Sequence, residues 1–476
     1  MSLKSRSYET IPASDEAYDA ANFSNKKFMP NKGPYIGKRH WLILVLALLS
    51  ETIYSVKVYM TVCIVAMTDP NASSNKDVPT YDWKNKGIIL SAYMWGLAIP
   101  QLFAGWLSSR YNVKLILISM MITCSITGFL IPVAAANFGS TGVIICRLIQ
   151  GMALGTINPC QFSLYGKWVP PHERCRLMGL VFSGYLIGII VSMFLSGLLA
   201  ASRFGWPLVI YIYSSIGLLW SILFACVASN SPEEHPTITK EERYYIQWSL
   251  SQNHKRKYLT PWRKILTSPC VWSNICSKAG SFFGFVLILS EISNYMKNVL
   301  KVDIKENGIY SALPYISTLV TVYLFGFISD KITARNIFSV TTTRKVFVTI
   351  GTIFPCLTLL LITLSKPEEK IKIIIAFALT VSFDMAGNLN GTGVNGVDLS
   401  PNHAGFIEGL SNQISQILSS LSPLLVDLFV SNEENNAQWN IIFYISVVIR
   451  IVSAIIFLIF GSGKVQPWND EILVDD

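Results

Sequence analysis

Five charged residues lie inside long apolar stretches of the sequence, where an uncompensated charge is costly. They are Glu51, Lys57, Arg147, Lys278 and Asp384. A charged side chain at membrane depth normally faces a water-filled pathway or a partner charge, and an arginine cannot be neutralised by losing its proton. These residue types indicate a protein that binds or moves charged solutes within a membrane.

Lys57 and Arg147 form the candidate anion site. Both lie in the outer third of their predicted spans, 41–67 and 141–165, at similar depth. If both face a central cavity they can hold a carboxylate or a phosphate, and the arginine can do so through two hydrogen bonds. Two alternatives remain open. Lys57 can extend its ammonium to the membrane surface, and Arg147 can pair permanently with an acidic residue.

Asp384 and Glu51, near the middle of their spans, are the candidate coupling carboxylates. Burial favours the neutral acid and a neighbouring cation favours the carboxylate, and a proton carrier needs that balance. The alternative is a static pair, Asp384 with Lys278 or Glu51 with Lys57. Lys278 is otherwise a further candidate for the substrate site. The five embedded residues have three positive and two negative charges, a surplus that suits a monovalent anion or a partly neutralised dianion.

The composition requires a membrane. Of the 476 residues, 51% are hydrophobic and 14% are charged, and the mean hydropathy is +0.44, which is too apolar for a soluble protein of this length. The net charge is +9, and the basic residues that give it lie between the apolar stretches. They form no basic patch with aromatic residues, so we expect no nucleic-acid binding. The sequence has no nucleophile–base pattern, metal-ligand spacing or phosphate-binding motif, so we expect neither an enzyme nor a bound cofactor or metal.

Twelve stretches are long enough to cross a bilayer, which takes about 20 apolar residues. An even number of crossings puts both termini on one side. The loops 108–114, 166–175 and 330–345 carry several Lys and Arg, so we expect these loops and both termini to be cytoplasmic. The predicted spans are 41–67, 86–107, 115–136, 141–165, 176–200, 206–228, 271–295, 308–329, 346–365, 371–396, 406–430 and 440–460.

The predicted fold is an all-α membrane protein with twelve transmembrane helices in two six-helix bundles. In the connecting loop, Thr237 or Thr239 can cap a surface helix whose first turn holds Glu241 and Glu242. GWLSSR at 105–110 recurs as GFISDK at 326–331, which indicates that the bundles are repeats. The predicted order is a cytoplasmic tail (1–40), a bundle (41–228), a cytoplasmic linker (229–270), a second bundle (271–460) and a cytoplasmic tail (461–476).

The loop 68–85 contains the glycosylation sequon Asn71-Ala72-Ser73. It is usable only if the loop faces the exterior or a lumen, in agreement with the predicted orientation. Asn22-Phe23-Ser24, in the predicted cytoplasmic tail, shows that such triplets also occur by chance. We predict a glycan at Asn71.

Several motifs resemble one group of transporters. Gly105 with Arg110, and Gly326 with Asp330, resemble the interhelical loop signature of the major facilitator superfamily, with Ser109 where aspartate is usual. Within it the chain is similar to the anion:cation symporter family. The matching stretches are YSVKVYMTVCIVAM (54–67), RLIQGMALG (147–155), KWVPPHER (167–174), SPEEHP (231–236), VNGVDLSPNHAG (394–405) and GSGKVQPW (461–468).

The resemblance implies a symporter of organic or inorganic anions, driven by sodium or protons. Tyr54, which begins the first stretch, joins the candidate substrate site. Gly105, Arg110, Gly326 and Asp330 become candidate gating residues. Asn395 and Asp398, at the inner end of span ten, can form a cytoplasmic latch with span eleven or a loop.

Departures from the family pattern are also informative. Leu154 stands where the family has a glutamate implicated in proton coupling, and Gly396 where it has a histidine. We hypothesise that Asp384 supplies the missing carboxylate, because span ten is the repeat counterpart of span four. The alternatives are an uncoupled anion facilitator and a membrane receptor without transport. We expect a monomer in the plasma membrane or in a lysosomal or vesicular membrane.

Overall fold

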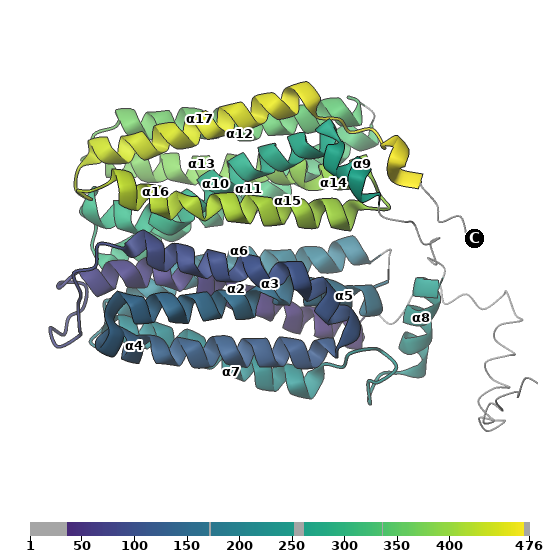
Figure 1. Ribbon diagram of the computed structural model, residues 1–476, viewed down its shortest axis with the longest axis horizontal. Helices are drawn as coiled ribbons and strands as arrows, with labels where there is room; N and C mark the ends of the chain where they lie inside the picture. Colours follow the sequence, from purple (N-terminus) through teal and green to yellow (C-terminus); the bar gives the residue numbers. More distant parts are fainter. Residues whose placement is uncertain (1–35, 171–172, 252–260, 336, 471–476) are drawn as a thin grey trace, which may run out of the picture.

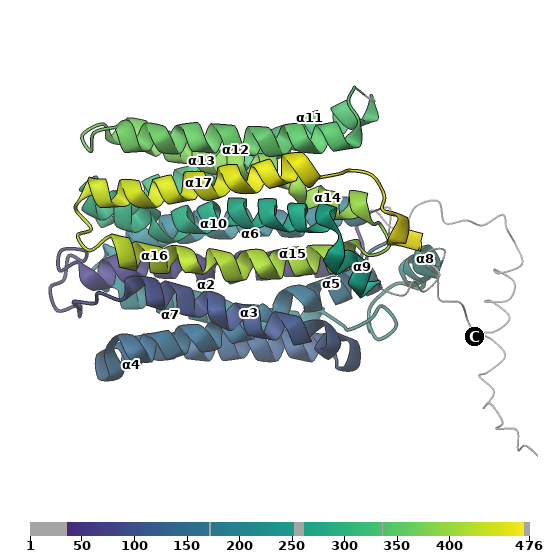
Figure 2. The ribbon, with the colours of Figure 1, turned by 45° about the horizontal axis from the view of Figure 1, so that its top comes forward.

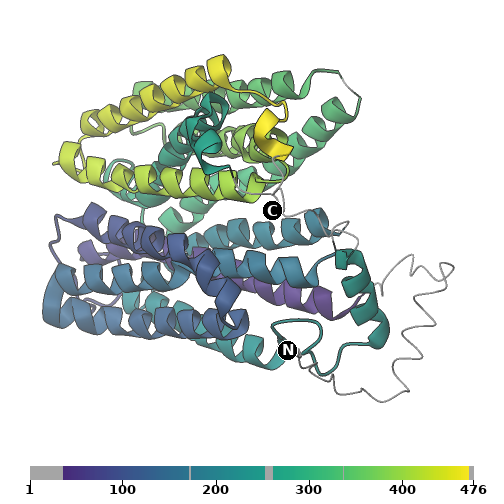
Figure 3. The same cartoon turned by 45° about the vertical axis from the view of Figure 1, so that its right-hand side comes forward.

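The computed structural model describes residues 36–170, 173–251, 261–335 and 337–470, and these residues form helices and connecting turns without a strand. Two helical bundles lie side by side (Figures 1 and 3). The N-terminal bundle contains α2 (Lys38–Thr68), α3 (Lys86–Arg110), α4 (Val113–Gly155), α5 (Ile157–Trp168), α6 (Arg174–Ala200) and α7 (Gly205–Val227). The C-terminal bundle contains α10 (Pro269–Asn298), α11 (Ile304–Ala334), α12 (Val340–Leu364), α13 (Lys370–Asn390), α14 (Thr392–Leu399), α15 (Ala404–Ser419), α16 (Leu421–Phe429) and α17 (Asn436–Phe460).

All the predicted spans fall on helices, and the all-helical membrane fold is confirmed. Nine helices in the described part of the chain are long and apolar enough to cross a membrane, so the count of twelve crossings stays a prediction. One of the nine, Val113–Trp168, has 56 residues, or about 84 Å of helix, against a hydrocarbon core of about 30 Å. Its chain reverses at Gly139, whose φ of 60° and ψ of −146° are not helical.

Glycines set two local features of the helices. Span ten breaks at Gly391, between α13 and α14. Gly151 and Gly155 let α4 approach α3 closely, because a Cβ at these positions would lie 2.1 Å from the Tyr93 carbonyl oxygen and 2.4 Å from that of Leu97.

The connecting segment contains α8 (Lys240–Ser251) and α9 (Trp262–Thr267). The Oγ1 atom of Thr239 accepts a hydrogen bond from the Glu242 backbone N–H at 3.3 Å, so the predicted cap is present. Glu242 and Glu173 both bind the guanidinium of Arg39, at 3.1 and 2.8 Å. These bonds fasten α8 to the start of α2.

Three helices that carry candidate site residues or their partners lie centrally. Figure 2 shows α2, α10 and α15 in the middle of the molecule, with α4 and α12 towards opposite edges. We call the end of the bundles next to α8 the α8 end. The other end, where the loop 430–435 joins α16 to α17, we call the Glu433 end (Figure 1).

Candidate functional site

Arg147 lies in the interior of the N-terminal bundle, with 1% of its surface exposed. Its guanidinium donates to the carbonyl oxygens of Val56 at 3.0 Å and Lys57 at 3.4 Å, and to Oε1 of Gln150 at 3.1 Å. No acidic side chain pairs with it in the described part of the chain, so the alternative of an acidic clamp finds no support there. Arg147 instead holds α4 against the backbone of α2 at Lys57.

Aromatic rings complete the surroundings of Arg147. Its guanidinium carbon lies 4.5 Å from the centre of the Tyr93 ring and 5.8 Å from that of Tyr59, distances at which a cation is attracted to the ring face. Its Nε atom is buried without a hydrogen-bond acceptor. The positive charge is therefore only partly compensated by neutral groups.

Lys57 is 6% exposed and lies between the two bundles. Its Nζ atom is 5.2 Å from the centre of the Tyr54 ring and 5.7 Å from that of Phe282, on α10 of the other bundle. Among the described residues, no group forms a hydrogen bond or ion pair with this ammonium. The alternative that Lys57 extends to the membrane surface is wrong, because its side chain is enclosed by rings.

Tyr54, the third predicted substrate residue, lies beside Lys57. Its ring centre is 4.7 Å from that of Tyr185 on α6. The Tyr185 hydroxyl donates to Oδ1 of Asn158 at 3.0 Å and lies 3.3 Å from Oε1 of Gln161, both on α5. The structure thus brings Tyr54, Lys57 and Arg147 together, with a polar group from α5 and α6 beside them.

Asp384 pairs with Arg450 on α17. Their bonds are 2.5 Å from Nη1 to Oδ1 and 3.1 Å from Nη2 to Oδ2, and each side chain is 1% exposed. Asp384 therefore does form a static ion pair, but the predicted partner Lys278 is wrong, because the partner is Arg450. Gly284 on α10 leaves room for this pair, since a Cβ there would lie 2.2 Å from Nη2 of Arg450.

Lys278 pairs instead with Glu408 on α15, at 2.5 Å. Glu51 accepts hydrogen bonds from the hydroxyls of Ser55 at 2.9 Å and Thr52 at 3.4 Å and has no cation partner among the described residues. The predicted static pair of Glu51 with Lys57 is therefore wrong as well. The structure leaves the coupling roles of Asp384 and Glu51 as predictions.

The embedded charge count from the sequence was incomplete. Four further charged residues lie inside the predicted spans, apart from Lys86, Arg176 and Lys372 in the first two positions of theirs: Glu291, Glu408, Asp427 and Arg450. With them, the embedded set has four positive and five negative charges, so the predicted positive surplus is wrong. The same criterion, a charge within an apolar stretch, would have found them. The positive character is local to Lys57 and Arg147, which lack acidic partners in the described chain.

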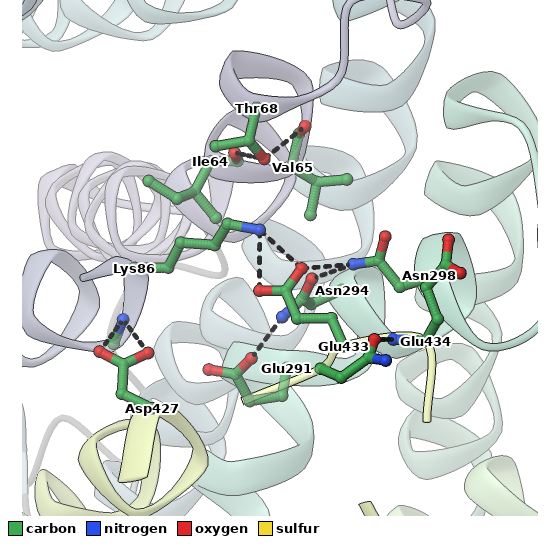
Figure 4. A network of polar contacts seen from close by, with 12 residues as sticks. Ile64, Val65, Thr68, Lys86, Glu291, Asn294, Asn298, Asp427, Glu433 and Glu434 are labelled. Atoms are coloured by element: carbon green, nitrogen blue, oxygen red, sulfur yellow. Dashed lines mark hydrogen bonds and ion pairs between the residues drawn. The ribbon is translucent and has the colours of Figure 1, made fainter. Parts of the chain in front are cut away.

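Polar contacts join the two bundles at the Glu433 end (Figure 4). Lys86 on α3 binds both carboxylate oxygens of Glu433, at 2.8 and 2.7 Å, and Asn298 on α10 donates to the same carboxylate at 2.8 Å. The carboxylate of Asp427 on α16 accepts the Gly87 backbone N–H, at 2.9 Å to each oxygen, and so caps the start of α3. These contacts hold the bundles together at this end.

Further contacts between the bundles belong to the same junction, by which we mean the polar contacts that join the bundles at the Glu433 end. Lys297 on α10 pairs with Asp69 at 2.5 Å. Nearer the middle, Gln413 on α15 donates to the carbonyl oxygen of Ala98 on α3 at 2.8 Å. A cavity of about 470 Å³ lies within the junction and is lined by residues from both bundles, including Lys86 and Lys297.

The predicted latch residues lie within the C-terminal bundle. Asp398 binds Arg344 on α12, at 2.6 Å to Nε, and Asn395 donates to the carbonyl oxygen of Ser462 at 2.8 Å. Neither partner lies in span eleven, and the predicted alternative of a loop partner holds for Asn395, because Ser462 lies in the loop after α17. Arg344, expected in a cytoplasmic loop, lies within α12 and is 8% exposed.

The remaining gating candidates lie at helix ends near α8. Gly105 and Arg110 belong to the last turns of α3, and Arg110 is exposed. Gly326 and Asp330 belong to α11, and a Cβ at Gly326 would meet no atom within 4 Å. The surroundings of Gly105 and of the Asp330 side chain lie outside what the structure describes, so these gating roles stay predictions.

Comparisons with known proteins agree with this arrangement. The Major Facilitator Superfamily model matches residues 41–423. Sodium-dependent phosphate transport protein 1 of Mus musculus is 30% identical over 462 residues, covering 93% of this chain and 98% of that protein. Sialin of Ovis aries is 29% identical over 439 residues, covering 87% and 88%. The solved xylose transporter XylE of E. coli has a TM-score of 0.67 at 13% identity, covering 91% of this chain and 99% of that one. This chain is therefore a multi-pass membrane transporter, not an enzyme, and it belongs to the major facilitator superfamily, within the anion:cation symporter family that its motifs predict.

Proposed function

We propose that this protein is a secondary active symporter of a small organic or inorganic anion, such as phosphate or a carboxylate. The observation that carries the proposal is the ammonium of Lys57, which is buried between the bundles without a polar partner among the described residues. A buried charge without a partner is costly. An anion held by Lys57 and Arg147 supplies the missing charge, and a substrate site between the bundles suits this fold.

Alternating access of the two bundles is the proposed mechanism. The contacts of Lys86 with Glu433, Lys297 with Asp69 and Asp427 with Gly87 all cross the bundle boundary at the Glu433 end. Opening this end to release or admit an anion requires that these bonds break. The side chains of the two ion pairs keep between 12% and 30% of their surface exposed, so water can take over their charges when the junction opens.

A sodium or proton gradient is the proposed energy source. The sequence lacks a phosphate-binding motif for ATP, and embedded carboxylates can carry a cation. Glu51 has only hydroxyl partners in the described chain, which supports it as a carrier more than Asp384, whose two oxygens are bound by Arg450.

Both termini are proposed to be cytoplasmic, in the plasma membrane or a lysosomal or vesicular membrane, with the protein acting as a monomer. Basic residues at the α8 end, among them Arg110, Lys114 and Lys167, support this orientation. The Glu433 end then faces the exterior or a lumen.

Asn71→Gln tests the orientation. Asn71 is exposed at the Glu433 end, in the loop between α2 and α3. We expect this variant to remove the shift in gel mobility that an endoglycosidase produces on the wild type. The matched control is Asn22→Gln, in the other sequon, which should leave the shift unchanged. A wild-type protein without an endoglycosidase-sensitive shift would contradict the glycosylation prediction.

Uptake measurements test the function. The purified protein is reconstituted in liposomes, and uptake of radiolabelled phosphate, glutamate, sialic acid and urate is measured while sodium and proton gradients are varied separately. We expect one of these anions to accumulate above its external concentration under one gradient. Equilibration without accumulation would indicate an uncoupled facilitator, and no uptake under any gradient would favour a receptor.

A further inference from the structure

We propose that Glu408, through its ion pair with Lys278, is the group that couples proton movement to anion binding. The inference rests on the proposed anion transport and names its coupling residue. In one state Glu408 is ionised and holds Lys278. In the other, Glu408 carries a proton and Lys278 is free to contact the anion.

The geometry of Glu408 makes its pair with Lys278 easy to break. Its Oε2 atom lies 2.5 Å from the Lys278 Nζ atom, whereas its Oε1 atom is buried and accepts no hydrogen bond. The backbone of Gly396 on α14 is adjacent, because a Cβ there would lie 2.5 Å from Oε1. A buried oxygen without a donor is poorly stabilised as an anion, so Oε1 is the place where a proton relieves an unfavourable contact.

The Asp384–Arg450 pair shows the opposite properties. Both Asp384 oxygens accept from Arg450 and both side chains are 1% exposed. The side chains of Lys278 and Glu408 keep 15% and 23% of their surface exposed. Of the two pairs, the one between α10 and α15 is therefore accessible to protons and to a competing anion.

Lys278 is placed to share an anion with Lys57. Phe282, whose ring lies 5.7 Å from the Lys57 Nζ atom, is four residues after Lys278 on α10, and residues at this spacing share a helix face. The other helix of the pair also lies at the bundle boundary, since Gln413 on α15 bonds to Ala98 of the N-terminal bundle. An anion between the bundles thus has one candidate lysine on each side.

Among the charged groups near α15, Lys278 is the partner of Glu408. Within the described residues it alone forms an ion pair with this carboxylate. Asp398 is bound to Arg344, and His403 belongs to the turn that starts α15. The charged residues on the elements packed against α15 are Lys278, Glu291 and Lys297 on α10, Asp398 on α14, Arg110 and Lys86 on α3, Asp427 on α16, and Arg263 and Lys264 on α9.

Competition for Lys278 links the two solutes. A proton bound at Oε1 of Glu408 neutralises the carboxylate and releases the Lys278 ammonium, which then binds the anion. By linkage, the anion raises the proton affinity of Glu408 by the same factor as the proton raises the anion affinity. The loaded site gains one proton, on Glu408, with each anion that it binds, which gives proton–anion symport.

Glu408→Gln tests the proposal, because glutamine mimics the neutral acid. Wild type and variant are reconstituted in liposomes and supplied with whichever of phosphate, glutamate or sialic acid the wild type takes up. In the variant, we expect uptake to be equal with and without an inward proton gradient, while exchange of labelled for unlabelled anion continues. A second readout is proton uptake on anion binding to detergent-purified protein in weak buffer, which the variant should lose.

Glu291→Gln is the matched comparison, because it neutralises another embedded carboxylate on α10, which accepts a hydrogen bond from Asn294 and forms no ion pair among the described residues. It should keep the stimulation by protons. If Glu408→Gln is poorly produced, the double variant Lys278→Gln with Glu408→Gln, which leaves no unpaired charge, should be produced and show uptake independent of protons. Full proton stimulation in either Glu408 variant would overturn the proposal. A wild type driven by sodium alone would also overturn it, but would leave the proposed anion transport intact. Absence of any anion transport would instead reject the proposed function.

Discussion

Asp384→Asn is expected to destabilise the protein more than any other single neutralisation of an embedded acid. It leaves the Arg450 guanidinium buried in the C-terminal bundle without an anion, and arginine cannot lose its proton to relieve this. Breaking a buried pair by removing one partner costs about 3–5 kcal/mol. We expect little monodisperse protein on size-exclusion chromatography, and a strongly lowered melting temperature in what remains.

Arg450→Met provides the matched comparison. It leaves the Asp384 carboxylate, which can be neutralised by taking up a proton, so this variant should be less damaged and should recover stability as the pH is lowered. The double variant Asp384→Leu with Arg450→Met removes both charges and should be close to wild type in stability, because replacing a buried pair by apolar residues is often neutral or stabilising.

The same variants decide whether Asp384 has a coupling role. A well-folded Asp384→Asn protein that transports the anion but ignores the proton gradient would show that the hypothesis from the sequence was right and that Arg450 is a partner the carboxylate can leave. A poorly folded Asp384→Asn protein together with a stable double variant identifies the pair as structural. Melting temperatures and uptake by all three variants give the answer.

The fold could be predicted from the sequence because its determinants are local. About twenty consecutive apolar residues make a span wherever they occur, and Gly391 and Gly151 act on their own helices or immediate neighbours. The breaks after Thr156 and at Ser420 were not predicted. Each break nevertheless has a local cause, because Pro159 and Pro423 lie three residues after them and cannot donate a backbone hydrogen bond to the carbonyl four residues earlier.

The ion pairs could not be predicted for a physical reason. Lys278 and Glu408 are 130 residues apart and Asp384 and Arg450 are 66 apart. Which charges meet depends on how α10, α13, α15 and α17 pack and rotate about their axes. The sequence identifies an embedded charge one helix at a time, whereas its partner is selected by a packing that involves the whole bundle.

Lys57 and Arg147 could be grouped from the sequence because each lies in the outer third of an apolar span, at similar depth. The aromatic surroundings of Lys57 were not predictable, since Phe282 comes from the other bundle. That contact is the feature that places Lys57 at the bundle boundary, and it leads to the second prediction with a large effect.

Lys57→Met is expected to raise the KM for the transported anion about 100-fold, which corresponds to about 2.7 kcal/mol, within the cost of about 2–5 kcal/mol for losing one partner of a buried charge pair. Stability should be unchanged or improved, because no described side chain pairs with Lys57 and its removal leaves no opposite charge behind. Initial rates of uptake of phosphate or sialic acid, whichever the wild type transports, are measured in liposomes together with the melting temperature.

The combination of a large loss in transport with an intact fold separates a substrate contact from a structural charge, and Asp384→Asn should show the reverse. Lys57→Arg keeps the positive charge next to the Tyr54 and Phe282 rings and should retain much of the uptake. Lys372→Met, which removes an exposed lysine paired with Glu369 at 3.1 Å, should change neither quantity. An unchanged KM in Lys57→Met would mean that the anion does not contact this ammonium, and Arg147 alone would then have to supply the positive charge of the site.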